Sequence, residues 1–130
     1  MYRALDIFFF AFHSTLILFV LTGWIWRKTR KIHLAVVVLT AFSWFFLGIW
    51  FGFGYCPCTD WHWRVREQLG DHNLPFSYIK FLFDRITGWD ADPTLVNIIT
   101  VAAFALAFAA SVWLNVRDRR RIRIRLPFVQ

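Results

Sequence analysis

The sequence predicts an all-α integral membrane protein, with three transmembrane helices and two short amphipathic helices in one loop outside the membrane. Hydrophobic residues make up 58% of the 130 residues, more than a soluble domain of this length carries. Three apolar stretches, at about residues 5–26, 33–53 and 93–114, each supply the roughly 20 helical residues that cross a hydrocarbon core. We therefore treat residues 1–130 as a single membrane domain.

The positions of lysine and arginine predict the orientation of the chain. The link between the first two stretches contains RKTRK at residues 27–31, and the tail at residues 115–130 is also basic. The loop at residues 54–92 instead carries more acidic than basic side chains. Because basic segments stay cytoplasmic, we expect a bacterial inner-membrane protein whose amino terminus and long loop lie outside, in the periplasm, and whose tail lies in the cytoplasm.

The formal net charge of +7 does not indicate nucleic acid binding. Most basic residues lie beside predicted membrane ends, where an anionic lipid surface attracts each of them by ~1 kcal/mol. Tryptophan is also typical of membrane boundaries, because its ring is apolar and its N–H is polar. The residues that we expect at the lipid interface are Trp24, Trp26, Trp61, Trp63, Trp89, Trp113, Arg119, Arg120 and Arg121.

The first apolar stretch contains two ionisable residues, Asp6 and His13. Such side chains are costly in a bilayer and usually face the interior of a helix bundle. Two interpretations of His13 stay open: a neutral histidine bonded to a neighbouring helix, or a ligand or proton-handling role. His33 begins the second stretch at a different depth, so we expect it at the interface and expect no haem shared with His13.

Small residues predict where the second and third helices pack. Because lipid supplies no hydrophobic drive between helices, small side chains that permit close approach are typical of their interfaces. Gly48 and Gly52 have this spacing in the second stretch, and Ala103, Ala107 and Ser111 repeat it in the third. We expect these faces to pack against each other or against another protein.

Capping signals divide the long loop into two short helices. Thr59 or Asp60 is expected to cap the first, which runs through WHWRVREQL. The second segment, FSYIKFLFDRIT, follows Pro75, ends at Gly88 and repeats apolar residues at helical spacing. Asp92-Pro93 supplies a cap and a first-turn proline for the third span.

The densest group of reactive side chains lies in GYCPCTDWHW, residues 54–63. Cys56, Cys58 and His62 are ligand types that suit zinc or copper, although their spacing matches no standard structural zinc site. A disulfide between the two cysteines would close a small, strained ring. The remaining interpretation is a structural corner between a span and a surface helix. The candidate functional cluster comprises His13, Asp6, Cys56, Cys58, Asp60 and His62.

The order of landmarks along the chain resembles a small bacterial membrane family, the domain of unknown function 2784. The landmarks are His13, Gly23, Arg27-Lys28, His33-Leu34, Cys56-Pro57 with Thr59, and Ile79 to Gly88. Cys58 stands where the resemblance leads us to expect an apolar residue, so a mechanism that needs both thiols would not be general to the family. The resemblance implies the topology and no activity.

We expect an accessory or scaffolding subunit of a larger membrane protein complex, because three spans leave little room for a private substrate cavity and the aromatic surface is extensive. The alternative is a membrane redox or metal-binding protein with a site at Cys56, Cys58, His62 and His13. A third interpretation is a subunit that contacts lipid or pigment. The candidate cofactors are thus a metal ion or a bound lipid or pigment. The expected partners are the lipid bilayer and other membrane subunits, with no nucleic acid.

Overall fold

The computed structural model describes residues 1–125, and every regular element in that range is a helix. The elements are α1 (Tyr2–Thr22), α2 (Arg30–Phe42), the π-helical turn η1 (Ser43–Leu47), α3 (Gly48–Phe51), α4 (Pro57–Gln68), α5 (Tyr78–Thr87) and α6 (Pro93–Arg125). Three stretches are long and apolar enough to cross a membrane: Tyr2–Thr22, Arg30–Phe51 and Pro93–Ile124. The predicted all-helical membrane fold with two short loop helices is confirmed.

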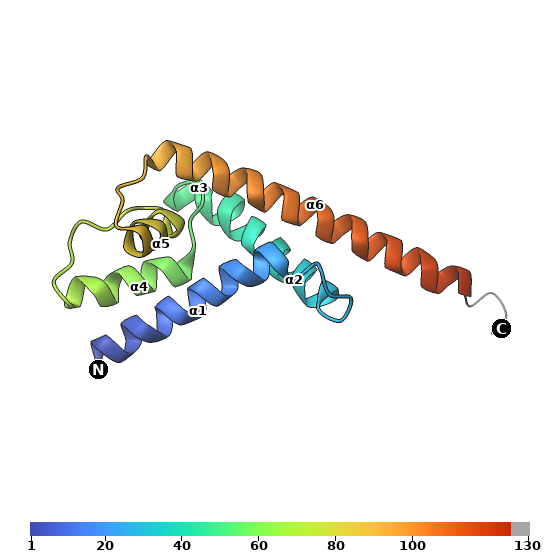
Figure 1. Ribbon diagram of the computed structural model, residues 1–130, viewed down its shortest axis with the longest axis horizontal. Helices are drawn as coiled ribbons and strands as arrows, with labels where there is room; N and C mark the ends of the chain where they lie inside the picture. Colours follow the sequence, from blue (N-terminus) through green and yellow to red (C-terminus); the bar gives the residue numbers. More distant parts are fainter. Residues whose placement is uncertain (126–130) are drawn as a thin grey trace.

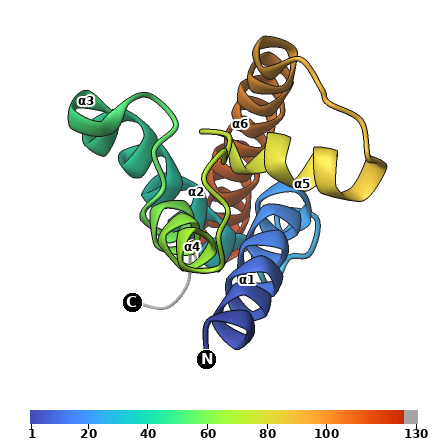
Figure 2. The same cartoon turned by 90° about the vertical axis from the view of Figure 1, so that its left-hand side faces the viewer.

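Helix α6 runs along most of the length of the molecule, which has two distinct ends (Figure 1). The amino terminus, α4 and α5 lie at one end, which we call the loop end. The link between α1 and α2 and the last turns of α6 lie at the other, which we call the basic end. Viewed from the loop end, α3 stands away from α6, whereas α4 lies close to α1 (Figure 2).

The local signals for α5 and α6 act as expected. Ser77 precedes α5 and its side chain accepts a hydrogen bond from the backbone N–H of Lys80, and Gly88 ends the helix with a φ of +71°. Asp92 accepts from the backbone N–H of Leu95 at 2.8 Å, directly before the first residue of α6. These caps satisfy N–H groups that have no partner within a helix.

Helix α4 begins earlier than the sequence predicts. Pro57 is its first residue and Cys56 precedes it, so Thr59 and Asp60 lie inside the first turn and do not cap the helix. Proline favours this position because its fixed φ suits a helix and its missing N–H would have no partner there. The turn buries Thr59 against the bundle.

The two glycines expected to pack the second span against the third lie elsewhere. A Cβ at Gly48 would lie 3.3 Å from Cα of Phe53, and one at Gly52 would lie 3.5 Å from the ring of Phe76. Gly52 has a φ of +100° and ends α3. These glycines therefore shape the exit from the second span and not its contact with α6, where Ala107 and Ser111 are buried and Ala103 is half-buried.

Helix α1 ends at Thr22, sooner than expected, and the turn that follows satisfies its last carbonyl groups. Gly23 N–H donates to Phe19 O, the indole N–H of Trp24 donates to Leu21 O, and the N–H of residue 25 donates to Thr22 O. Backbone groups within a membrane need such partners because lipid offers none. The carbonyl of Val20 receives its hydrogen bond from a different helix, as described next.

His33 is fully buried and joins three helices, a role that its expected position at the membrane interface did not indicate. Its Nε2 lies 2.8 Å from Val20 O of α1, and its Nδ1 lies 2.9 Å from Ser111 Oγ of α6. Because a carbonyl oxygen can only accept, Nε2 carries a proton and donates to Val20, while Nδ1 accepts from the Ser111 hydroxyl. The buried Asn115 side chain adds a hydrogen bond of 3.0 Å to Arg30 O.

Candidate functional site

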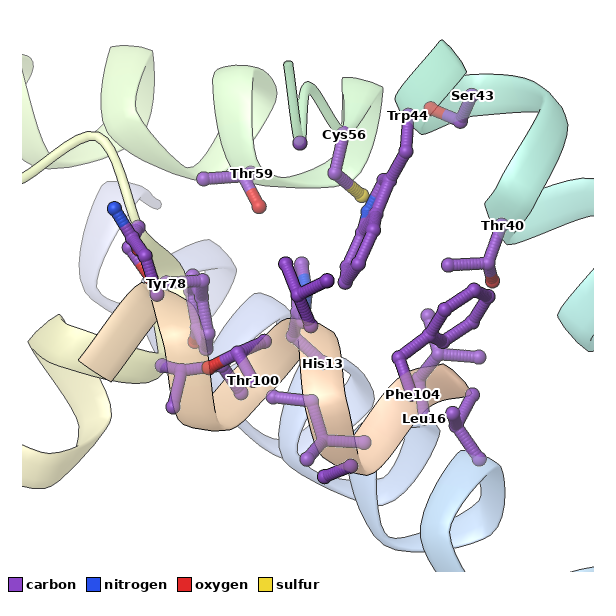
Figure 3. A pocket seen from close by; sticks show the side chains of 18 of the residues that line it. His13, Leu16, Thr40, Ser43, Trp44, Cys56, Thr59, Tyr78, Thr100 and Phe104 are labelled. Atoms are coloured by element: carbon purple, nitrogen blue, oxygen red, sulfur yellow. The ribbon is translucent and has the colours of Figure 1, made fainter. Parts of the chain in front are cut away.

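A cavity of about 680 Å³ lies among the spans toward the loop end. Its volume falls within the ~300–1,000 Å³ typical of small-molecule sites, so the expectation that three spans leave little room for a cavity is wrong. Helices α1, α2 with η1, α4, α5 and α6 each contribute lining side chains (Figure 3). No aspartate, glutamate, lysine or arginine is among the described residues that line it.

The π-helical turn η1 forms part of the cavity wall. Ser43, Trp44 and Leu47 of this turn all line the cavity. The hydroxyl of Ser43 donates to Tyr55 O at 2.7 Å, and the Trp44 ring packs against Phe104 with centroids 4.6 Å apart. Turns of this kind are rare and occur often at functional sites, and here one presents a large aromatic ring to the cavity.

Two aromatic side chains with free polar atoms line the cavity from α1 and α5. The rings of His13 and Tyr78 stack with centroids 3.9 Å apart and an interplanar angle of 10°. Only 7% of His13 and 5% of Tyr78 is exposed. Within residues 1–125, neither His13 Nδ1 nor the Tyr78 hydroxyl has a hydrogen-bond partner. Burial raises the pKa of Tyr78 to about 12, so at neutral pH its hydroxyl keeps its proton and can donate.

Behind Tyr78, a charged network ties α1 to α4. His62 Nε2 and Arg66 Nη1 lie 2.7 Å and 2.9 Å from the same Oδ1 atom of Asp6. Arg66 also pairs with Asp71. Burial lowers the pKa of His62 below its ordinary 6.5, while the hydrogen bond with Asp6 opposes part of this change. At neutral pH, a neutral His62 therefore donates from Nε2, and the Asp6 charge is balanced by Arg66.

The rest of the predicted cluster is not gathered around a metal position. Cys56 lines the cavity, and both Cys56 and Cys58 are free thiols. Burial, together with the neighbouring Cys56, raises the pKa of Cys58. Asp60 pairs with Arg64 at 3.1 Å in an ion pair at the surface. Across the part of the chain that the structure describes, no three His, Cys, Asp or Glu side chains could hold a metal ion.

A protein-family model described as "Protein of Unknown function (DUF2784)" matches residues 3–116. The chain belongs to this family. The matched range contains every residue that lines the cavity, so the site lies wholly within the family domain. No curated protein and no solved structure matches the chain.

Trp63 of this DUF2784 protein supports the site from behind, although we expected it at the lipid interface. Its indole N–H donates to Pro75 O at 3.0 Å, and its ring stacks on Tyr78 with centroids 5.3 Å apart. This contact holds the Tyr78 ring between Trp63 and His13. Among the other tryptophans expected there, Trp26, Trp61, Trp89 and Trp113 are exposed, as lipid contact requires.

Tyr78 and Arg66 were not predicted as site residues from the sequence. Arg66 follows His62 by four residues on a helix, so the two share a face, and both reach Asp6. This spacing could have revealed the pair. Tyr78 did not stand out as a site residue because it begins an amphipathic helix, and the apolar repeat of that helix already explains an aromatic residue there.

Proposed function

We propose that this DUF2784 protein binds a lipid-like amphipathic molecule in the cavity among its spans. The cavity itself carries the proposal: it has apolar walls and a few polar side chains among them, the usual composition of a ligand site. Because protein interiors are close-packed, a large apolar space that stays empty would be unusual. Lipid from the surrounding membrane is available to fill it. An apolar chain along Leu16 and Phe104 would leave a polar head near His13 and Tyr78.

We place the protein in the bacterial inner membrane with the loop end toward the periplasm and the basic end in the cytoplasm. The basic residues at 27–31 and those of the last turns of α6 all lie at the basic end, which supports this orientation. Arg119, Arg120 and Arg121 would then meet anionic headgroups of the inner leaflet. The polar end of the cavity would lie in the outer half of the bilayer.

An accessory or scaffolding subunit is the second candidate. The face of η1 and α3 supports it, because Phe45, Phe46, Ile49 and Trp50 are all exposed. Bilayer lipid would cover this exposed face as well as a partner subunit would. The face therefore supports a partner less strongly than the cavity supports a bound molecule. Purification from native membranes in mild detergent tests this second role by whether a stoichiometric membrane protein accompanies the chain.

Two alanine variants on α6 test ligand binding. Ala103 lines the cavity, whereas its neighbour Ala102 is exposed on the outer side of the helix. Ala103→Phe would fill the cavity and Ala102→Phe would not. We expect native mass spectrometry to detect bound lipid on the wild type and on Ala102→Phe, but several-fold less on Ala103→Phe. A wild type without bound lipid, or equal retention by both variants, would refute the proposal.

A further inference from the structure

We propose that the molecule in the cavity is an acyl-ester lipid, and that the Thr59 hydroxyl and the Trp44 indole N–H donate hydrogen bonds to its ester carbonyl oxygens. This inference rests on the proposed function and narrows it from any amphipathic molecule to lipids that carry a carbonyl group beside their chains. It is carried by two polar side chains that project into the cavity, by the uncharged lining described above and by the position of Thr59 along the chain.

Thr59 projects its hydroxyl into the cavity from the first turn of α4 (Figure 3). Only 8% of the residue is exposed. The other threonines of the lining, Thr40 and Thr100, donate their hydroxyls to backbone carbonyls of their own helices. Within residues 1–125, Thr59 Oγ1 makes no such bond. Buried polar atoms nearly always have a partner, so this hydroxyl points to a hydrogen-bonding group on a bound molecule.

Trp44 supplies a second donor from η1, where its ring projects into the cavity (Figure 3). The indole N–H groups of Trp24 and Trp63 donate to backbone carbonyls, whereas Trp44 Nε1 makes no hydrogen bond to the part of the chain that the structure describes. The unbonded polar atoms that are fully enclosed include neither Thr59 Oγ1 nor Trp44 Nε1. Both atoms therefore have accessible surface through which a bound molecule can reach them.

The chemistry of these two groups selects an uncharged acceptor. An indole N–H can only donate, whereas a hydroxyl donates or accepts, so an acceptor oxygen is the partner that suits both. No aspartate, glutamate, lysine or arginine is among the described lining, and an ionised group placed there would have no counter-ion in the cavity wall, which is very unfavourable. An ester carbonyl meets both conditions, because it is an uncharged acceptor attached directly to an apolar chain.

The position of Thr59 along the chain agrees with the depth of ester groups in a bilayer. The second span ends at Phe51 and α4 begins at Pro57, so Thr59 lies near the edge of the hydrocarbon core at the loop end. The ester groups of glycerolipids lie at this edge, between the acyl chains and the polar head groups. The acyl chains would then extend along Leu16 toward the basic end.

The test compares two lipids that differ only in their carbonyl groups. The probes are a diacyl phosphatidylglycerol and the dialkyl ether phosphatidylglycerol with chains of the same length. Each is titrated into the purified full-length protein in detergent, and native mass spectrometry measures its binding. Because the two head groups are identical, charges outside the cavity, such as the Arg85 guanidinium over the Phe81 ring, act equally on both lipids.

The variants remove one donor at a time and keep most of the shape of the side chain. Thr59→Val removes the hydroxyl, Thr59→Ser keeps it, and Trp44→Phe removes the indole N–H. Thr15→Val is the matched control, because Thr15 is exposed on α1 and its hydroxyl bonds to Ala11 O. Thermal unfolding without added lipid checks each fold. Because the Thr59 hydroxyl makes no bond within the described chain, Thr59→Val should not lower the transition temperature.

We expect the wild type, Thr59→Ser and Thr15→Val to bind the diacyl lipid about 3- to 10-fold more tightly than the ether lipid, the contribution of one hydrogen bond. Thr59→Val and Trp44→Phe should each reduce this preference. Equal binding of the two lipids by the wild type, or a preference that neither variant reduces, overturns the inference but leaves the proposed function standing. Binding of neither lipid overturns the inference, and if protein from native membranes also carries no lipid, the proposed function falls with it.

Discussion

Replacing His33 by alanine should separate α1 from the other two spans. The ring makes two buried hydrogen bonds, to Val20 O and to Ser111 Oγ. Hydrogen bonds between membrane helices contribute ~0.6 kcal/mol on average, and a buried carbonyl left without a partner costs ~1–3 kcal/mol. Adding the packing lost with a buried ring, we expect the free energy of unfolding of His33→Ala to fall by about 2–4 kcal/mol.

A double-mutant cycle isolates the bond between His33 and Ser111. Ser111→Ala removes one bond and should cost about 0.6–1.5 kcal/mol. The sum of the two single-variant losses in unfolding free energy should exceed the loss in the double variant by roughly this amount, because the double variant loses the shared bond only once. Thr15→Ala is the control, since the Thr15 hydroxyl bonds to Ala11 O within its own exposed helix turn and should change stability by less than about 0.5 kcal/mol.

Unfolding by sodium dodecyl sulfate in mixed micelles, followed by far-ultraviolet circular dichroism, measures these energies. The assay compares wild type, both single variants, the double variant and the control under one condition. The reasoning is refuted if His33→Ala unfolds within about 0.5 kcal/mol of the control, or if the single effects simply add. Either result would mean that His33 does not carry the contact among α1, α2 and α6.

Protonation, ion pairing and thiol access give three further tests. The folded protein lowers the pKa of His62 below 6.5, so the unfolded state binds a proton at a higher pH than the folded state does. The free energy of unfolding should therefore fall as the pH drops below about 6.5. His62→Gln should remove much of this pH dependence when unfolding is measured across the same range. Asp118→Asn leaves the buried Arg30 without its partner at 2.7 Å, and thermal scans should show a lower transition temperature; an unchanged one would contradict the pair's role. Bound lipid should slow alkylation of Cys56 several-fold in a Cys58→Ser protein, and equal rates with and without lipid would show that the thiol does not face the ligand.

The features that the sequence predicted well are those whose physical partners lie a few residues away. The cap at Asp92 bonds the N–H of Leu95, and Gly88 ends α5 through its own backbone conformation. Such interactions follow from local chemistry and can be seen in a short stretch of sequence. The three apolar spans are equally local, because length and composition alone define them.

The features that it missed depend on distant partners. His33 and Ser111 are 78 positions apart, and nothing near His33 in the sequence indicates a serine on the last span. The π-helical turn η1 leaves the hydrophobic pattern of the second span unchanged, and its contact with Tyr55 O lies beyond the span. Trp63 was predicted to lie at the lipid interface because its neighbours in the sequence do not distinguish a tryptophan that faces lipid from one that packs on Tyr78.

The two histidines of the spans are buried to a similar degree but differ in the hydrogen bonds of their ring nitrogens. His33 is fully buried and both ring nitrogens have protein partners, so it has nothing left to offer a ligand. His13 is almost as buried, yet its Nδ1 lacks a partner among the described residues and its ring lines the cavity. That nitrogen is buried within the bundle, so a molecule in the cavity would contact the His13 ring and not Nδ1. Both interpretations that the sequence left open for His13 therefore remain compatible with its position.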